Sequence, residues 1–301
     1  VLSVLSQDYR GPLEIILALG PSRDRTNEIA AKLASQDNRV KLLDSPTGKT
    51  AAGLNLALAA SKSPVVVRVD GHAQIPINYI SLIVEILNKT GAVNVGGVMA
   101  AVGTTAFERA VAGAMRSPLG VGASRFHTGG EAGEVDTVYL GAFRREALVA
   151  IGGFDERFTR AQDWELNFRL RENGGVIYFD PRLHVTYRPR SSVGALAKQY
   201  FEYGRWRRVV SRRHSGTINY RYLAPPFALL GFSASLVLGV LLSSIFFIPA
   251  LVYLLFVVLA SLKISTSIGE YLLLLLVIPT MHFAWGAGFI SSPKTLVPAS
   301  Q

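Results

Sequence analysis

The chain has 301 residues, a formal net charge of +10 at pH 7 and no cysteine, which excludes a small module held together by disulfide bonds. Residues 1–222 contain 29 of the 31 Lys and Arg residues and 20 of the 21 Asp and Glu residues. This part is long enough for a soluble domain with its own core. Residues 223–301 have only Lys263, Glu270 and Lys294 as charged side chains, which excludes an ordinary soluble domain there.

Strand-like and helix-like segments alternate along the first hundred residues. Repeated units of this kind are typical of an α/β domain, with a mostly parallel sheet that is covered by helices. We expect strands at 13–19, 40–43, 64–70 and 92–100, and helices at 24–34, 49–60 and 77–88.

Residues 47–50, Thr-Gly-Lys-Thr, look like the end of the phosphate-binding loop of nucleotide hydrolases. That loop needs a glycine five residues before its Gly-Lys pair, and this position is Leu43. The sequence therefore does not support a P-loop. Lys49 opens the expected helix, where it is either solvated or close to a phosphate group.

Asp70 and His72 follow the apolar run 64–69, with Gly71 between them. Ligands of open α/β sheets bind at the carboxyl ends of the strands. An acid and a histidine in this spacing can hold one cation that also binds phosphate oxygens. The alternative is an Asp-Gly turn beside a solvated histidine. Arg68 interrupts the apolar run, so it either pairs with a buried acid or reaches the phosphate site.

Residues 162–170 form a second chemical cluster, which opens with Gln162, Asp163, Trp164 and Glu165. Asp163 lies in the first turn of the expected helix, where the helix dipole favours its ionised form. It can therefore accept a proton, or it can simply cap the helix. Asp163 and Glu165 are two residues apart and point to different sides of the helix, so we expect different roles for them.

Residues 193–222 form a basic segment with interleaved aromatic residues, including Arg205 and Trp206. Such segments bind nucleic acid or lie at a membrane surface. Because this one directly precedes an uncharged stretch, we favour an amphipathic interfacial helix and no nucleic-acid partner.

Three uncharged stretches, 223–242, 245–262 and 271–290, are each close to the length of a membrane-spanning helix. We expect about three transmembrane helices within 223–292, followed by a tail at 293–301. The basic residues before the first stretch favour a multi-pass protein of the cytoplasmic (inner) membrane. In this arrangement the soluble domain faces the cytoplasm and the C-terminus lies across the membrane.

The order of four motifs resembles that of family 2 glycosyltransferases, and above all the membrane-bound enzymes of succinoglycan-type exopolysaccharide synthesis. The motifs are Ser22-Arg23-Asp24-Arg25-Thr26, Asp70-Gly71-His72, Gly152-Gly153-Phe154-Asp155 and Gln162-Asp163-Trp164-Glu165-Leu166. The resemblance implies a GT-A fold for residues 1–192, a nucleotide-sugar donor, a divalent cation (Mn²⁺ or Mg²⁺) and the membrane as a partner. The family's opening strand is absent before Val1.

The resemblance also implies roles for individual residues. Asp70 and His72 match the metal-binding motif, and Asp163 matches the general base. Gly141, Phe143 and Arg144 fall where the family shapes the sugar and acceptor pocket, and Arg205 and Trp206 resemble the end of the Gln-x-x-Arg-Trp motif. The candidate substrate-binding residues are Ser22, Asp24, Lys49, Arg68, Gly141, Phe143, Arg144, Gln162, Glu165, Arg205 and Trp206.

Besides the missing opening strand, two further departures limit the resemblance. Gly20 replaces the acid that commonly contacts the base, so the base of the donor stays open. Gln199 lies six residues before Arg205 instead of three, which favours single-sugar addition over processive synthesis.

The sequence thus predicts inverting, metal-dependent transfer of a hexose from a nucleotide sugar to a lipid-linked glycan in cell-surface or exopolysaccharide synthesis. Two alternatives stay open. One is a polyprenyl-phosphate glycosyltransferase, whose acceptor is the polyprenyl lipid itself. The other is a non-catalytic membrane scaffold with a degenerate glycosyltransferase fold.

Overall fold

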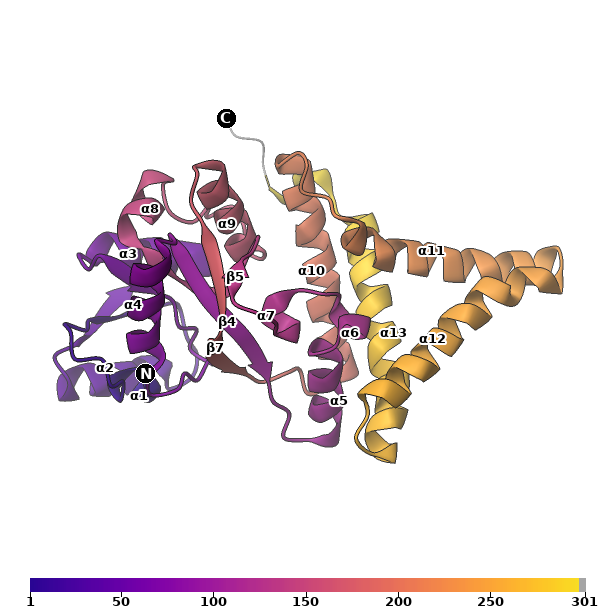
Figure 1. The fold of residues 1–301 in the computed structure, drawn as a ribbon, viewed down its shortest axis with the longest axis horizontal. Coiled ribbons are helices and arrows are strands. Elements are labelled where there is room, and N and C mark those ends of the chain that lie inside the picture. The colour runs from indigo at the N-terminus through magenta and orange to yellow at the C-terminus, as the bar shows by residue number, and fades with distance from the viewer. Residues whose placement is uncertain (298–301) are drawn as a thin grey trace. The chain divides into compact units, whose positions relative to one another are not determined.

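The computed structural model describes residues 1–297, which form two compact units (Figure 1). The first unit contains Val1–Met99 and Gly129–Thr186, and the second contains Ala100–Thr128 and the chain from Tyr187 onward. The segment 100–128 therefore belongs to the second unit, although it lies within the predicted domain 1–192. Of the predicted tail 293–301, residues 298–301 lie outside the described residues.

The elements of the first unit alternate as the sequence predicts, and their order ends with a long strand that continues into the second unit. They are α1 (Leu2–Leu5), β1 (Ile15–Leu19), α2 (Thr26–Gln36), β2 (Val40–Asp44), α3 (Thr50–Ala60), β3 (Val65–Val67), α4 (Tyr79–Thr90), β4 (Asn94–Ala101), β5 (Gly133–Glu134), β6 (Tyr139–Arg144), α8 (Arg145–Ala150), α9 (Gln162–Glu172) and β7 (Ile177–Tyr187).

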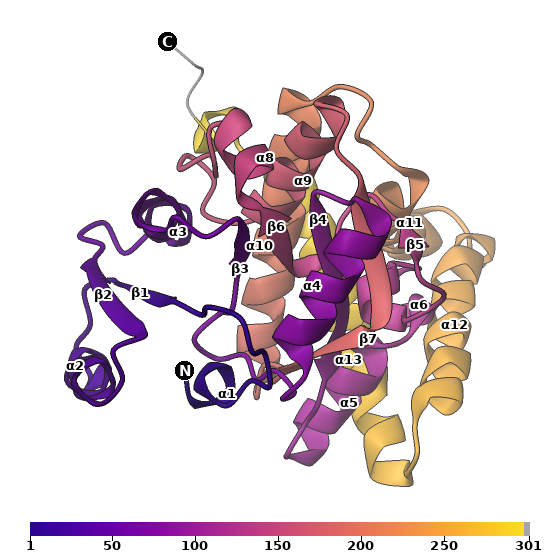
Figure 2. The same cartoon turned by 60° about the vertical axis from the view of Figure 1, so that its left-hand side comes forward.

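The strands form a mixed arrangement, where we expected a mostly parallel sheet. β1 and β2 pair in parallel as a two-stranded sheet, and a second sheet has the order β3-β6-β4-β7-β5 (Figure 2). In that sheet β6 runs antiparallel to both β3 and β4, and β5 runs antiparallel to β7. A buried apolar run shows that a segment is a strand but not its direction, so the sequence could not show that β6 lies between β3 and β4.

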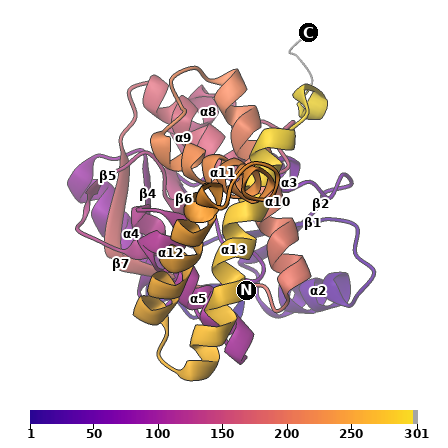
Figure 3. The ribbon, with the colours of Figure 1, turned by 90° about the vertical axis from the view of Figure 1, so that its right-hand side faces the viewer.

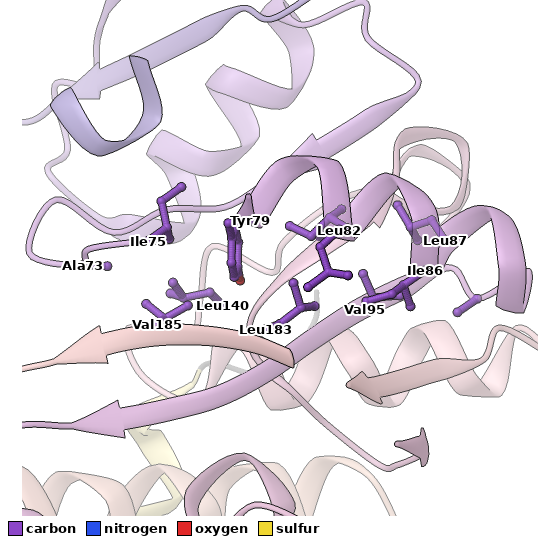
Figure 4. Close-up of a cluster of buried hydrophobic side chains, with 13 residues drawn as sticks. Ala73, Ile75, Tyr79, Leu82, Ile86, Leu87, Val95, Leu140, Leu183 and Val185 are labelled. Atoms are coloured by element: carbon purple, nitrogen blue, oxygen red, sulfur yellow. The ribbon is translucent and has the colours of Figure 1, made fainter. Parts of the chain in front are cut away.

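The core lies where α4 covers the five-stranded sheet (Figure 4). Tyr79, Ile83, Ile86 and Leu87 are at most 2% exposed and recur at the spacing of one helix face. They pack with sheet residues from three strands. Gly91 then ends α4 in the left-handed conformation (φ 68°), as is usual for a helix C-cap. This layer fixes the strands whose ends form the candidate site.

The second unit is helical. Its elements are α5 (Ala106–Met115), α6 (Pro118–Val121), α7 (Arg125–Thr128), α10 (Val193–Arg213), α11 (Tyr220–Leu241), the short 3₁₀ helix η1 (Ser244–Phe247), α12 (Ile248–Ile264), α13 (Ile268–Ser291) and the 3₁₀ helix η2 (Lys294–Leu296).

Among the described residues of this unit, three helical segments are long and apolar enough to cross a membrane: Tyr220–Leu241, Ser244–Ile264 and Ile268–Ser291. They correspond to the three uncharged stretches of the sequence. Figure 3 looks almost down α11, whereas α13 is seen from the side and runs beside α10.

Candidate active site

The candidate site begins where β3 leaves the sheet. The backbone N–H of Arg68 donates to the carbonyl of Gly141 on β6 (3.1 Å), which extends the strand pairing by one residue. The Arg68 side chain is only 6% exposed. Its Nε donates to Oδ1 of Asp70 (2.9 Å), and its Nη1 donates to Oδ1 of Asp163. One buried guanidinium therefore joins the two acids that the sequence placed in separate motifs.

Asp163 is the second residue of α9, which begins after a sharp turn. The N-cap residue Ala161 is in the left-handed region (φ 57°), which few residues other than glycine adopt. Burial raises the pKa of Asp163 above its usual range, and the nearby charge of Asp70 adds to this, while Arg68 partly offsets it. The carboxyl group is thus a stronger proton acceptor than an exposed aspartate would be.

Three buried polar side chains connect α9 to the sheet. Asn94 on β4 donates to Oδ1 of Asn167 on α9 (2.7 Å), and Nδ2 of Asn167 donates to the hydroxyl of Thr137 (2.9 Å). Asn94 and Asn167 are at most 1% exposed. Because buried polar groups lose free energy when they lose their partners, this chain fixes α9 in one register. Sequence reasoning missed these residues, since single Asn and Thr side chains form no recognisable motif.

A second anchor holds the turn that precedes α9. Glu165, 1% exposed, accepts two hydrogen bonds from Arg169 (2.7 and 2.8 Å). Arg169 also donates to the carbonyls of Ile151 and Gly153 (both 2.8 Å). We expected Glu165 to bind substrate, but the structure shows it buried and paired with the arginine that supports the Gly152-Gly153 turn. Asp163 and Glu165 thus have different partners, Arg68 and Arg169.

The backbone of β6 bends beneath Arg68. Leu140 (φ 60°) and Gly141 (φ 87°) are both in the left-handed region, and the pairing register with β4 shifts at the same place. A Cβ atom at Gly141 would lie 2.7 Å from Oδ1 of Asn94 and 2.5 Å from the Phe143 ring. Glycine is therefore required here by both conformation and space.

Phe143 and Arg144 do not join the acidic cluster. Phe143 is 2% exposed and packs edge-on against Phe154. In the strand register Arg144 lies opposite Val65, at the other end of β3 from Arg68. Its guanidinium donates to the carbonyls of Leu87 and Ala92 at the end of α4.

The remaining predicted residues lie elsewhere. Ser22 donates to Asp24 (2.6 Å), and Asp24 accepts from the N–H of Thr26 at the start of α2; these bonds lower the pKa of Asp24 to about 2. Lys49 is the exposed N-cap of α3. Gln162 is the buried first residue of α9.

Arg205 and Trp206 belong to the second unit, where both donate to the carboxylate of Glu202.

Asp70 and His72 were predicted to bind a metal ion. They lie in one turn, closed by the hydrogen bond from the N–H of Ala73 to the carbonyl of Asp70 (2.8 Å). The Asp70 side chain is 25% exposed and His72 is exposed. No group of three or more His, Asp or Glu side chains that could hold a metal ion occurs among residues 1–297. Asp70 and His72 offer one carboxylate and one imidazole, so a cation held there would need further ligands, such as phosphate oxygens.

Comparison with known proteins decides the family. The profile described as glycosyl transferase family 2 matches residues 1–152, half of the chain. The chain belongs to glycosyltransferase family 2. The matched region contains Asp70 and ends before Asp163.

Two curated relatives of this family 2 chain were found. The succinoglycan biosynthesis protein ExoA of Rhizobium meliloti (strain 1021) is 36% identical over 213 residues, 70% of the chain. The match spans only 64% of that protein's length. The second relative, from Methanococcus voltae, is named dolichyl N-acetyl-alpha-D-glucosaminyl phosphate 3-beta-D-2,3-diacetamido-2,3-dideoxy-beta-D-glucuronosyltransferase. It is 24% identical over 259 residues, 82% of the chain and 78% of that protein.

Among solved structures, the mannosyltransferase PcManGT from Pyrobaculum calidifontis, in complex with GDP-Man and Mn²⁺, has a TM-score of 0.65. It covers 96% of this chain and 81% of its own, at 18% identity. This likeness supports the fold, which is the GT-A glycosyltransferase fold with a mixed sheet.

Proposed function

We propose that this protein transfers a hexose, with inversion, from a nucleotide sugar to a lipid-linked glycan in exopolysaccharide or cell-surface glycan synthesis. The observation that carries the proposal is the convergence of Asp70 and Asp163 on Arg68. Asp70, which would hold the cation at the diphosphate, and Asp163, which would accept the proton, lie within reach of one guanidinium. Both can therefore face the same sugar carbon.

The residues of the chain divide the work of this reaction. Asp163 accepts the proton of the acceptor hydroxyl as that oxygen attacks, a contribution of about 100- to 10,000-fold in rate. Arg68 donates to both carboxylates and holds them in place before substrate binds. The divalent cation, Mn²⁺ or Mg²⁺, would be held by Asp70 and His72 and would supply positive charge for the leaving diphosphate.

The lipid-linked acceptor rests on two further observations. Three helical segments of the second unit could cross a membrane. The Methanococcus voltae relative is a transferase whose name contains a dolichyl-linked sugar. The basic residues before α11 favour the cytoplasmic side of the membrane for the first unit.

The proposal is tested by substituting Asp163 with Asn in the full-length protein and measuring sugar transfer with a panel of nucleotide sugars and Mn²⁺. We expect transfer to fall by about 100-fold or more, because the amide cannot accept the proton. Donor binding should change little, and wild-type product should have the inverted anomeric configuration by NMR.

Glu172→Gln is the matched control, because Glu172 is an exposed acid at the other end of the same helix. Equal activity of the Asp163→Asn and Glu172→Gln variants would contradict the role of Asp163. A product with a sugar phosphodiester bond would instead identify a polyprenyl-phosphate glycosyltransferase.

A further inference from the structure

Helix α13 has two different long faces. Its exposed apolar residues, Ile268, Leu272, Leu276 and Ile290, are 47–75% exposed and fall on one side at helical spacing. On the other side Leu274, Val277, Ile278 and Met281 are at most 1% exposed. One face of α13 is therefore buried by protein along the helix, while the opposite face is apolar and open.

The buried face lies on α10 towards the C-terminal end of α13 and on α5 towards its start, where Arg109 pairs with Glu270. A Cβ atom at Gly204 would lie 2.0 Å from the carbonyl oxygen of Trp285, and one at Gly288 would lie 2.0 Å from that of Phe201. The hydroxyl of Ser292 donates to the carbonyl of Arg205 (2.9 Å). The two backbones touch at this point. Farther along α10, Arg208 lies over the Phe289 ring and Arg212 donates to the carbonyl of Ser292, so both helices advance together and run parallel.

Helix α10 is unsuited to the interior of a bilayer. Its 21 residues include seven charged side chains: Lys198, Glu202, Arg205, Arg207, Arg208, Arg212 and Arg213. Charged side chains are rare and costly within the hydrocarbon layer. The part of α13 that touches α10, residues 285–292, shares its depth. The start of α13 packs on α5, where Arg109 pairs with Glu270, so α13 cannot cross the layer while α5 and α10 stay outside.

Helices α11 and α12 behave differently. Only 11% of the apolar stretch of α11 and 22% of that of η1 and α12 is buried within the protein, against 39% for α13. They form a hairpin, closed by bonds from Ser235 to the carbonyl of Phe246 and from the N–H of Ala250 to Ser235. With η1 counted in the second arm, the arms are Tyr220–Leu241 and Ser244–Ile264, of 22 and 21 residues, which is the length that a crossing needs.

The start of this hairpin is marked by charge. The guanidinium groups of Arg207 and Arg221 lie over the Tyr222 ring, 4.0 and 5.2 Å from its centroid, and both donate to its hydroxyl. Tyrosine and arginine are typical of the headgroup level of a membrane. This level coincides with the C-terminal end of α13, because Tyr222 stacks on Trp285.

We propose that only the α11–α12 hairpin crosses the bilayer, while α10 and α13 lie together along its surface, with the exposed stripe of α13 in contact with lipid. Both ends of α13 then stay on the same side as residues 1–99. This replaces the three crossings that composition predicts. The inference rests on the membrane association in the proposed function but not on sugar transfer.

The test uses the absence of cysteine, since any introduced thiol is the only one in the chain. Ser35→Cys marks the first unit, Ser243→Cys marks the hairpin tip and Lys294→Cys marks the end of α13. Each variant is prepared in two kinds of native membrane vesicles, right-side-out and inside-out. Both kinds are treated with a maleimide that cannot cross the membrane. We expect Lys294→Cys to react in the same orientation as Ser35→Cys, and Ser243→Cys in the opposite one.

Three results would overturn the inference. Lys294→Cys could be labelled in the same vesicle orientation as Ser243→Cys, which is the outcome of three crossings. Ser243→Cys could be labelled in the same vesicle orientation as Ser35→Cys, which would mean that the hairpin does not cross. Lys294→Cys could react in neither orientation until detergent is added, which would place it within the hydrocarbon. Labelling does not depend on enzymatic activity. A protein that is inactive but is labelled as expected would contradict the proposed function and leave this inference intact.

Discussion

At the scale of single residues, the charge balance around Arg68 determines the properties of the candidate site. The guanidinium pairs with Asp70 and Asp163, so one positive charge faces two negative ones. Burial by itself would lower the pKa of Arg68, but the two carboxylates outweigh it and raise that pKa. Arg68 is therefore charged at every accessible pH and holds the site together.

Replacing Arg68 with Met should destabilise the fold by about 3 kcal/mol at neutral pH, because two partly buried carboxylates lose their partner. Burial raises the pKa of Asp163 in the folded state, and the loss of Arg68 raises it further. The folded state then prefers the protonated acid, so the penalty is absent below the unfolded pKa of about 3.9 and grows as pH rises. Thermal unfolding in detergent at pH 4 and pH 7 measures this difference.

Arg23→Met serves as the control, because Arg23 is exposed before α2. Arg68→Lys keeps the charge and should lose less stability than Arg68→Met. A loss of stability in Arg68→Met that is independent of pH would show that lost packing, and not charge, explains it.

At the scale of elements, the position of α9 depends on the buried bonds of Asn167. This helix carries Asp163, whereas Asp70 follows β3, so the two acids meet only if α9 is docked on the sheet in the correct register. Asn167 bonds to β4 through Asn94 and to the segment before β6 through Thr137.

Replacing Asn167 with Leu should cost about 1–3 kcal/mol, because the buried groups of Asn94 and Thr137 lose a partner. It should also lower kcat more than it raises KM for the donor, since Asp163 shifts while the donor pocket stays. Asn173→Leu is the control: Asn173 is the exposed C-cap of the same helix. Unfolding curves and steady-state kinetics of both variants check the prediction, and equal kinetics would contradict it.

The sequence predicted the elements better than their arrangement. Short β-branched runs and helical spacing located the early strands and helices to within a few residues, because burial imposes these patterns. The direction of β6 and the left-handed backbone at Leu140 and Ala161 left no pattern, since neither residue type favours such a conformation. For Arg68 the sequence left two roles open, and only the structure shows the pair of acids that it binds.

At the scale of the whole molecule, the two units are interleaved along the chain. Residues 100–128 leave the first unit, join the second and return at Gly129. Within the second unit α5 packs against α13, and Arg109 on α5 pairs with Glu270 on α13. Neither unit is therefore a continuous piece that can be cut out with a single boundary.

A fragment that ends at residue 192 should aggregate without detergent, because it retains α5 but lacks α13. The side of α5 that packs on α13 would then face water. In the full chain Val111 and Met115 are at most 2% exposed, so replacing both with Thr should lower its melting temperature. Size-exclusion chromatography and thermal unfolding measure the two effects. A fragment that is monomeric without detergent would contradict the prediction.

The interleaving also sets an order of assembly during translation. Helix α5 leaves the ribosome about 150 residues before α13, the helix on which it packs. During that interval the side of α5 that packs on α13 is uncovered, and such exposed apolar surface favours aggregation. The candidate site around Arg68 and Asp163 can thus form in the nascent chain before α13 has been synthesised and the second unit is complete.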